Sequence, residues 1–266
     1  MFKAFFGCEI TPFDRSIATK NLFPSEAHEE MVGRMVHAAE NRCFALCTGE
    51  VGAGKSTAAR AVSDILNPTR YLVLYITDSD LTPRNFYYEV LHQLGIQPRF
   101  YRGDAKRQLV KALMDMHESN RTPVVIIDEG HLLGRDMLEE IRFLMNFKMD
   151  SFSPLSLILM GQPELRATLQ AQAYEAIAQR VNIRFHLSAM GKLETKAYIE
   201  HHLKVAGVAR ALFTDEALYL VHEYSGGIAR KINNLCTACL LHAFAKSKSL
   251  VDDHTVRVVL ENEFLV

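Results

Sequence analysis

The stretch that decides the fold is Gly49-Glu50-Val51-Gly52-Ala53-Gly54-Lys55-Ser56, which matches G-x-x-x-x-G-K-[ST] at every fixed position. Its glycines let the backbone curl so that several N–H groups point at one anion. An apolar strand pattern, 43–48, precedes this P-loop, and a helical pattern, 57–66, follows it. The start of that helix adds a positive dipole end. The context therefore predicts a phosphate cradle.

Residue chemistry assigns roles within the cradle. Lys55 would reach the β- and γ-phosphates as a point charge, and the Ser56 hydroxyl would ligate Mg²⁺. Without an Asn-Lys-x-Asp guanine-reading motif in the chain, adenine is the better prediction, so the expected cofactors are ATP and Mg²⁺. The residues expected to hold the nucleotide are Gly49, Glu50, Val51, Gly52, Ala53, Gly54, Lys55, Ser56 and Thr57.

Two carboxylates follow a second apolar strand, Val124 to Ile127. Ligands of open α/β sheets bind at the carboxyl ends of the strands. Asp128 is therefore expected to hold Mg²⁺, and Glu129 to orient or deprotonate the attacking water.

Short apolar runs alternate with helical patterns through the first two thirds of the chain, which predicts a parallel sheet covered by helices on both faces. Beyond Gly191 only helical patterns occur, near 191–206, 214–224, 228–247 and 252–263. The predicted fold class is an α/β P-loop NTPase with a small all-helical C-terminal lid. The expected parts are an N-terminal segment, 1–40, an α/β core, 41–190, and the lid, 191–266.

Composition narrows the class of protein. The chain has 266 residues, 48% of them apolar, and a formal net charge of -1, which excludes a disordered chain and a global basic surface for nucleic acid. The apolar runs are too short to cross a bilayer, and no signal peptide is apparent. Five cysteines do not suggest a disulfide framework, so a cytoplasmic location is expected.

Several motifs together carry a family resemblance. In chain order they are the P-loop, Asp128-Glu129 with His131-Leu132-Leu133, Gly161-Gln162-Pro163-Glu164-Leu165, and Gly226-Gly227-Ile228-Ala229-Arg230. This order resembles AAA+ ATPases and, more narrowly, the ExeA/GspA group, which includes stand-alone transposition ATPases of the TniB and TnsC kind. The opening Phe5-Phe6-Gly7, Thr11-Pro12-Phe13, Leu22-Phe23 and Ser25-Glu26 is similar to that group's N-terminal segment.

The resemblance implies the strand order 5-1-4-3-2 and further site residues. Gln162 stands where sensor 1 belongs, and Arg230 matches sensor 2. Arg180 falls where a trans-acting arginine finger lies, with Arg184 as the fallback, so activity would require an oligomer. Phe13 and Phe23 either flank the adenine or pack beneath the core.

One local charge cluster is a candidate DNA contact. Its cations are Arg99, Arg102, Lys106 and Arg107, with aromatic neighbours and a single acid among them. They would bind duplex phosphates without reading bases, or else belong to a solvated loop and helix start.

Two other features are discounted. A zinc or redox site at Cys236 and Cys239 is discounted because both lie in one helical pattern, where buried cysteines behave as small apolar groups. His131 is placed as in Asp-Glu-x-His helicases, which need two RecA-like domains.

The favoured role is an ATP-switched, DNA-coating oligomer that regulates transposition and recruits a transposase. It is favoured because neither a membrane span nor a wall-binding region follows the lid. Two alternatives stay open. One is a secretion-associated ATPase of the ExeA type, and the other is a nucleotide-gated scaffold with incidental hydrolysis.

Overall fold

The computed structural model describes residues 2–145 and 152–264, and the chain forms two compact units. We call Ala27–Gly49 with Lys55–Leu187 the α/β unit. We call Met1–Glu26, Glu50–Gly54 and Ser188–Val266 the helical unit. Among the described residues, none of the helices combines the length and the apolar character needed to cross a bilayer.

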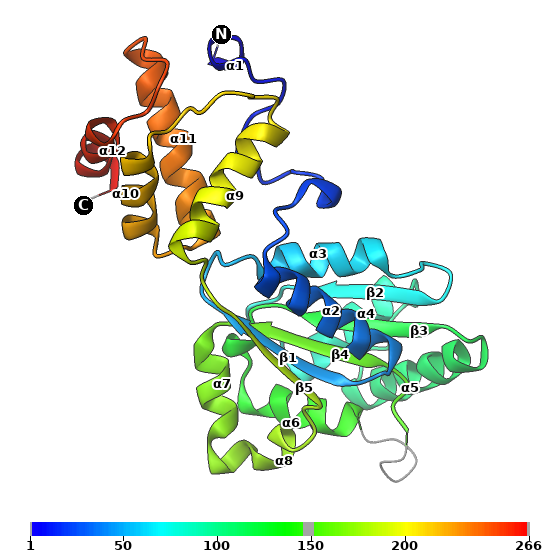
Figure 1. Cartoon of the computed structure of the whole chain (residues 1–266). Coiled ribbons are helices and arrows are strands. Elements are labelled where there is room, and N and C mark those ends of the chain that lie inside the picture. The colour runs from blue at the N-terminus through cyan, green and yellow to red at the C-terminus, as the bar shows by residue number, and fades with distance from the viewer. Residues whose placement is uncertain (1, 146–151, 265–266) are drawn as a thin grey trace. The chain divides into compact units, whose positions relative to one another are not determined.

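A five-stranded parallel sheet lies at the centre of the α/β unit (Figure 1). Its strands are β1 (Phe44–Gly49), β2 (Tyr71–Ile76), β3 (Thr122–Ile127), β4 (Ser156–Gly161) and β5 (Ile183–Leu187). Their order is β2-β3-β4-β1-β5, which is the expected order read from the opposite edge. Every residue of β1, β3 and β4 is buried, as a parallel sheet covered on both faces requires.

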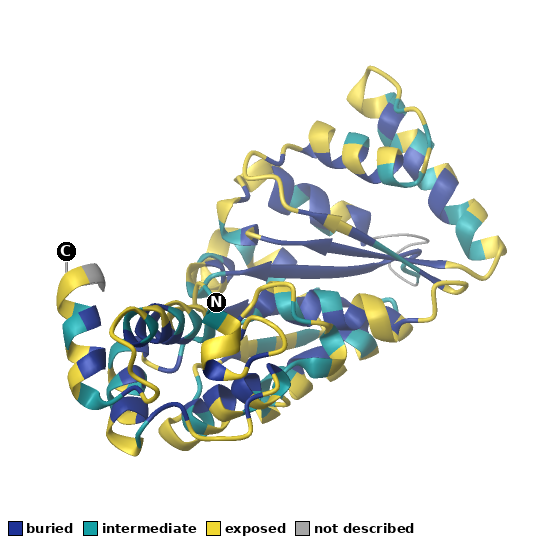
Figure 2. Ribbon diagram, turned by 90° about the horizontal axis from the view of Figure 1, so that it is seen from above, coloured by how far each residue is buried: buried dark blue, intermediate teal, exposed yellow. Residues whose placement is uncertain are grey.

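Alternation along the strands separates the two faces of the sheet. Val125 and Ile127 of β3 pack with Leu157 and Leu159 of β4 in a core to which the helices between β2 and β4 contribute. Their neighbours point to the opposite face and are equally buried. Figure 2 shows the strands mostly dark blue, whereas the flanking helices are yellow on their outer sides.

The helices of the α/β unit follow the strands. They are α2 (Glu26–Glu40), α3 (Lys55–Ile65), α4 (Pro83–Gln93), α5 (Arg102–Glu118), α6 (Arg135–Leu144), α7 (Pro163–Gln170) and α8 (Glu175–Ala178). Short 3-10 turns occur at η2 (Gly130–Leu132) and η3 (Gln172–Tyr174). The Thr82 hydroxyl caps α4 by accepting from the Asn85 amide, and Pro83 occupies the first turn. The sequence predicts this α6 helix from about Arg135 to Phe147, of which 146–147 lie outside the described residues.

In the helical unit, the described residues form helices and one isolated parallel bridge, between Phe213 and Val251. The helices are α1 (Phe2–Phe6), α9 (Lys192–Val205), α10 (Asp215–Ser225), α11 (Ala229–Ala245) and α12 (Asp253–Val259), with short turns η1 (Thr19–Asn21) and η4 (Leu260–Phe264). Thr214 and Asp252 cap α10 and α12. The core of this unit includes Phe6 and Phe13 from the N-terminal segment.

Candidate functional site

The P-loop connects the end of β1 with the first turn of α3. Gly52 and Gly54 have φ angles of 82° and 117°, in the region that L side chains rarely adopt. Helix α3 begins at Lys55, so its N-terminal amides lie beside the loop. The buried Lys55 ammonium donates to the Gly49 carbonyl oxygen at 2.7 Å. These features fit an anion with several negative oxygens.

Ser56 and Asp128 meet across two elements of the α/β unit. The Ser56 hydroxyl donates to Asp128 Oδ2 at 2.8 Å, and the Asp128 carboxylate is only 5% exposed. A hydroxyl beside a carboxylate is an oxygen donor pair suited to Mg²⁺, which prefers few carboxylates together with phosphate oxygens. The residues present therefore fit the expected cofactor.

Tyr75 is a site residue that sequence reasoning missed. Its hydroxyl donates to Asp128 Oδ2 at 2.5 Å from the neighbouring strand β2. Burial raises the pKa of Tyr75 well above its usual value, and the hydrogen bond to Asp128 raises it further. The phenol stays protonated and donates. The only sequence signal was a polar-tipped residue one position before the end of an apolar strand.

Glu129 occupies an unusual backbone position. Its φ angle is 53°, in the left-handed region, and its side chain is half exposed. The Glu129 amide donates to Asp128 Oδ1 at 2.8 Å. A non-glycine residue held in this conformation costs about 1–3 kcal/mol and is typical of functional sites.

Gln162, the predicted sensor 1 residue, begins α7 directly after β4. Its Nε2 lies 2.8 Å from His131 Nε2, while His131 Nδ1 lies 3.5 Å from Glu129 Oε2. His131 therefore stands between two predicted catalytic residues. From the sequence alone, this histidine was discounted.

Arg230, the predicted sensor 2 residue, lies in the first turn of α11 against the P-loop residue Gly52. Its backbone amide donates to the Gly52 carbonyl oxygen at 3.1 Å. A Cβ added to Gly52 would lie 2.5 Å from the Arg230 Cβ, so only glycine permits this approach. The Arg230 side chain itself is exposed.

Arg180 and Arg184, the two finger candidates, occupy different settings. Arg180 follows α8 and is partly exposed, and its amide donates to the Ile177 carbonyl oxygen at 2.9 Å. Arg184 lies in β5, where its guanidinium bonds to the Ala178 carbonyl oxygen. Arg184, the second finger candidate, thus makes this contact within the α/β unit.

Three of the four candidate DNA contacts bind carboxylates of this chain. Arg102 and Lys106 of α5 both bind Glu140 of α6, the Lys106 ammonium at 2.6 Å. Burial acts to raise the pKa of Glu140, but hydrogen bonds from Lys106, Tyr87 and Arg102 outweigh it and hold that pKa below its usual value.

The remaining two cations lie at the surface near the start of α5. Arg107 pairs with Asp104 at 2.5 Å. Arg99 is exposed, and its backbone amide donates to Gln108. The cluster therefore offers less uncompensated charge than the sequence suggested.

Both N-terminal aromatic residues pack on α9. Phe13 stacks on His202 with ring centroids 5.6 Å apart, and Phe23 meets Tyr198 edge-on at 5.7 Å. Phe13 is buried within the core of the helical unit. Both rings therefore pack on α9, and a place beside the adenine stays a prediction.

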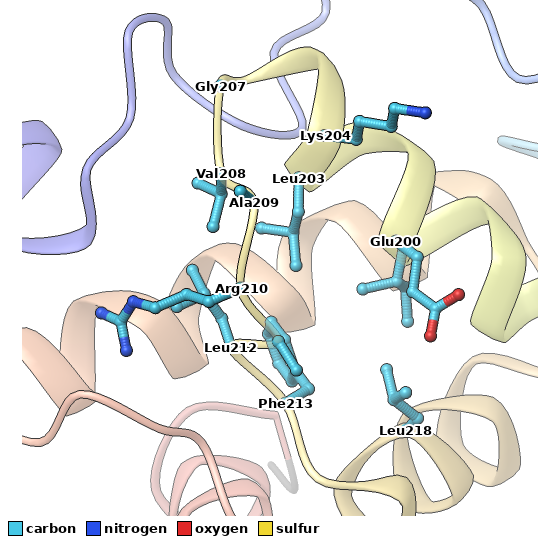
Figure 3. Close-up of a pocket in the computed structure, with 12 residues that line it drawn as sticks. Glu200, Leu203, Lys204, Gly207, Val208, Ala209, Arg210, Leu212, Phe213 and Leu218 are labelled. Atoms are coloured by element: carbon cyan, nitrogen blue, oxygen red, sulfur yellow. The ribbon is translucent and has the colours of Figure 1, made fainter.

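A separate cavity of about 520 Å³ lies in the helical unit between the end of α9 and the segment leading to α10 (Figure 3). Its apolar wall is formed by Leu203, Leu212, Phe213 and Leu218. The charged side chains of Lys204 and Arg210 extend away from it. It contains no phosphate-binding loop, so the P-loop remains the candidate site.

Among known protein families, one described as an AAA domain matches residues 38–169 of this chain. This segment includes the P-loop, the two carboxylates and Gln162. This chain carries an AAA domain.

Solved structures agree on the AAA+ fold. Drosophila ORC bound to DNA superposes with a TM-score of 0.72 at 17% identity, covering 93% of this chain and 63% of that chain. Cdc6p of Pyrobaculum aerophilum gives 0.70 at 15% identity, covering 94% and 72%. The RuvB Holliday junction branch migration motor of Thermotoga maritima gives 0.57 at 17%, covering 89% and 68%. At such identities the likeness concerns the fold alone.

A curated relative is more similar in sequence. General secretion pathway protein A of Aeromonas hydrophila is 34% identical over 252 residues, which make up 92% of this chain and 45% of that protein. The chain thus spans less than half of this relative's length. Among these comparisons, none supports a kinship with TniB or TnsC.

Proposed function

We propose that this AAA+ protein binds ATP with Mg²⁺ and hydrolyses it slowly. The observation that carries the proposal is the contact between the Ser56 hydroxyl and Asp128 Oδ2 at 2.8 Å, next to the bond from the Lys55 ammonium to the Gly49 carbonyl oxygen. Ser56 and Asp128 would hold Mg²⁺, which neutralises phosphate charge when bound.

The residues of this chain divide the remaining work. The P-loop amides and Lys55 bind the phosphates, and Asp128 is fixed by two hydroxyl donors. The Glu129 carboxylate accepts a proton from the attacking water or orients it, and the Gln162 amide helps to place that water. Arg230 would contact the nucleotide from the helical unit, and Arg180 would complete the site of a neighbouring subunit.

Nucleotide binding and turnover test this proposal separately. Binding of a fluorescent ATP analogue and phosphate release are measured for the intact chain, with and without Mg²⁺. Lys55→Ala should abolish binding, whereas Glu129→Gln should bind ATP and release little phosphate. Normal turnover by Glu129→Gln would remove Glu129 from its assigned role.

For the biological role, we propose a secretion-associated ATPase. The support is the 34% identity to general secretion pathway protein A, which extends over 92% of this chain. The transposition hypothesis rests on the resemblance noted above and on the Arg99–Arg107 segment, where Arg102 and Lys106 are both paired with Glu140. The secretion alternative is therefore favoured.

Electron microscopy with a non-hydrolysable ATP analogue separates the roles. Assembly that needs nucleotide but not duplex DNA is expected of the secretion-associated ATPase. Rings or filaments that form only on DNA would instead support the transposition regulator. Nucleotide-dependent assembly with turnover unaffected by any partner would favour the scaffold with incidental hydrolysis.

A further inference from the structure

We propose that His131 is a positioning residue that couples the side chains of Glu129 and Gln162, so that the two groups acting on the attacking water move as one. This inference deepens the proposed ATPase function and rests on it. The contacts that suggest it join η2 to the start of α7, two segments that follow different strands of the sheet.

Two glycines allow the close approach of these segments. A Cβ added to Gly130 would lie 2.5 Å from Leu159 Cδ1 and 3.0 Å from the Met160 carbonyl oxygen. A Cβ on Gly161 would lie 3.1 Å from the His131 amide nitrogen. The backbone before His131 thus packs directly on the end of β4. This packing holds the imidazole beside Gln162.

The proposed coupling requires one tautomer of His131. An amide Nε2 can only donate, so the His131 Nε2 that faces Gln162 Nε2 at 2.8 Å is the acceptor. His131 Nδ1 lies 3.5 Å from Glu129 Oε2 and also 3.5 Å from the backbone nitrogen of Gln162, so the coupling requires the ring proton on Nδ1, directed at the carboxylate. With this tautomer, the Gln162 amide donates to the ring, and the ring N–H points to the Glu129 carboxylate. The imidazole would thereby orient Glu129, the proposed general base.

The ring is well placed for this role. The His131 side chain is 13% exposed, whereas the Glu129 side chain is 48% exposed. The half-exposed carboxylate thereby gains a more buried neighbour. Glu129 also has a left-handed backbone, which leaves its direction dependent on such contacts. Removal of the ring should therefore affect turnover more than binding.

Kinetics of His131→Ala provide the first test. We expect kcat to fall roughly tenfold, at the lower end of what supporting partners of catalytic groups cost, with the Kd for ATP within about twofold of the native value. His92→Ala, a change at an exposed histidine of α4, is the matched control and should leave both quantities unchanged. A native kcat in folded His131→Ala, or equal losses of kcat and affinity, would overturn the proposal.

A double-mutant cycle tests the coupling itself. If His131 and Gln162 act as one unit, the His131→Ala/Gln162→Ala protein should turn over no more slowly than the slower single variant. Losses that multiply would contradict the proposal. The thermal midpoint of each variant, measured in parallel, identifies loss of folding.

The tautomer offers a readout independent of turnover. Nitrogen-15 shifts of the His131 ring should show the proton on Nδ1 in native protein, and Glu129→Gln should alter the Nδ1 shift. A ring protonated on Nε2 alone would refute the coupling. Should the native protein fail to hydrolyse ATP, the proposed function is lost while these shifts still decide the contact.

Discussion

The amide of Arg230 donates to the carbonyl oxygen of Gly52 at 3.1 Å, so the first turn of α11 touches the backbone of the P-loop. This contact is specific to glycine, because Gly52 has a φ angle of 82° and an added Cβ would lie 2.5 Å from the Arg230 Cβ. The residue predicted to sense nucleotide is therefore positioned by the loop that is predicted to bind the phosphates.

Gly52→Ala should weaken ATP binding about tenfold or more, because the left-handed conformation alone costs an alanine about 1–2 kcal/mol. Titration with a fluorescent ATP analogue measures the change. Gly33→Ala is the control, since an added Cβ in that helical turn meets nothing within 4 Å. It should leave binding unchanged and stabilise the fold by about 0.5–1 kcal/mol. Native affinity in Gly52→Ala would show that the loop tolerates the rearrangement.

Tyr75→Phe removes one of the two hydroxyl donors to Asp128. The carboxylate then loses orientation, so the Mg²⁺ concentration for half-maximal turnover should rise by about tenfold. Steady-state phosphate release across a Mg²⁺ titration measures this shift. Tyr71→Phe, at the opposite end of the same strand, should leave the titration unchanged. An unshifted curve for Tyr75→Phe would assign the phenol to packing.

Glu140→Gln should destabilise the α/β unit by about 1–3 kcal/mol, because a buried carboxylate that satisfies three donors is replaced by an amide. Urea unfolding at pH 7 measures this loss. Since the folded pKa of Glu140 lies below its usual value, its contribution is present above about pH 4.5 and declines as the pH falls below that value. The difference between native protein and variant should shrink accordingly.

The adjacent glutamate supplies the control for this experiment. Glu139 is exposed and pairs with Arg135 within α6, so Glu139→Gln should cost less than about 0.5 kcal/mol. Equal losses at both positions would mean that Glu140 stabilises through general surface charge. The same unfolding measurement on Arg102→Ala or Lys106→Ala tests whether these cations serve the fold.

The buried His202 predicts a pH dependence in the helical unit. Burial lowers its pKa to about 4, below the usual 6.5, with a further lowering from His201. The stability that depends on a neutral His202 is therefore complete above about pH 6.5 and falls as the pH drops toward 4. The loss is at most about 3 kcal/mol. Urea unfolding at pH 7, 6 and 5 should show the decline.

His202→Phe keeps a ring between Phe13 and Tyr198 but cannot take up a proton. Its stability should therefore decline less steeply over the same pH range. A slope identical to that of the native protein would place the titrating group elsewhere.

A finger that acts in trans makes a prediction about mixtures. Arg180→Ala and Glu129→Gln should each turn over ATP slowly when alone. Mixed together, a Glu129→Gln subunit supplies Arg180 to a neighbour that retains Glu129, so activity should recover in part. Phosphate release from equal mixtures measures the recovery. The comparison is a mixture of Arg184→Ala with Glu129→Gln. If activity recovers in this mixture but not in the mixture with Arg180→Ala, the finger role moves to Arg184.

Sequence by itself determined the elements that depend on local patterns. The P-loop spacing, the buried strand before Asp128 and the change to all-helical periodicity are readable because each lies within a short stretch of chain. The order of the strands followed from the family that those motifs resemble, and the sheet confirms it. Local chemistry was enough for the phosphate cradle and its two carboxylates.

Only the tertiary structure decided which distant side chains meet. The register of β2 against β3 brings Tyr75 to Asp128, and the packing of α5 on α6 gives Arg102 and Lys106 to Glu140. The approach of Gly130 to β4 brings His131 to Gln162. These pairs are separated by 31 to 53 residues along the chain. Periodicity states which face a residue occupies, but partners on other elements depend on how those elements pack.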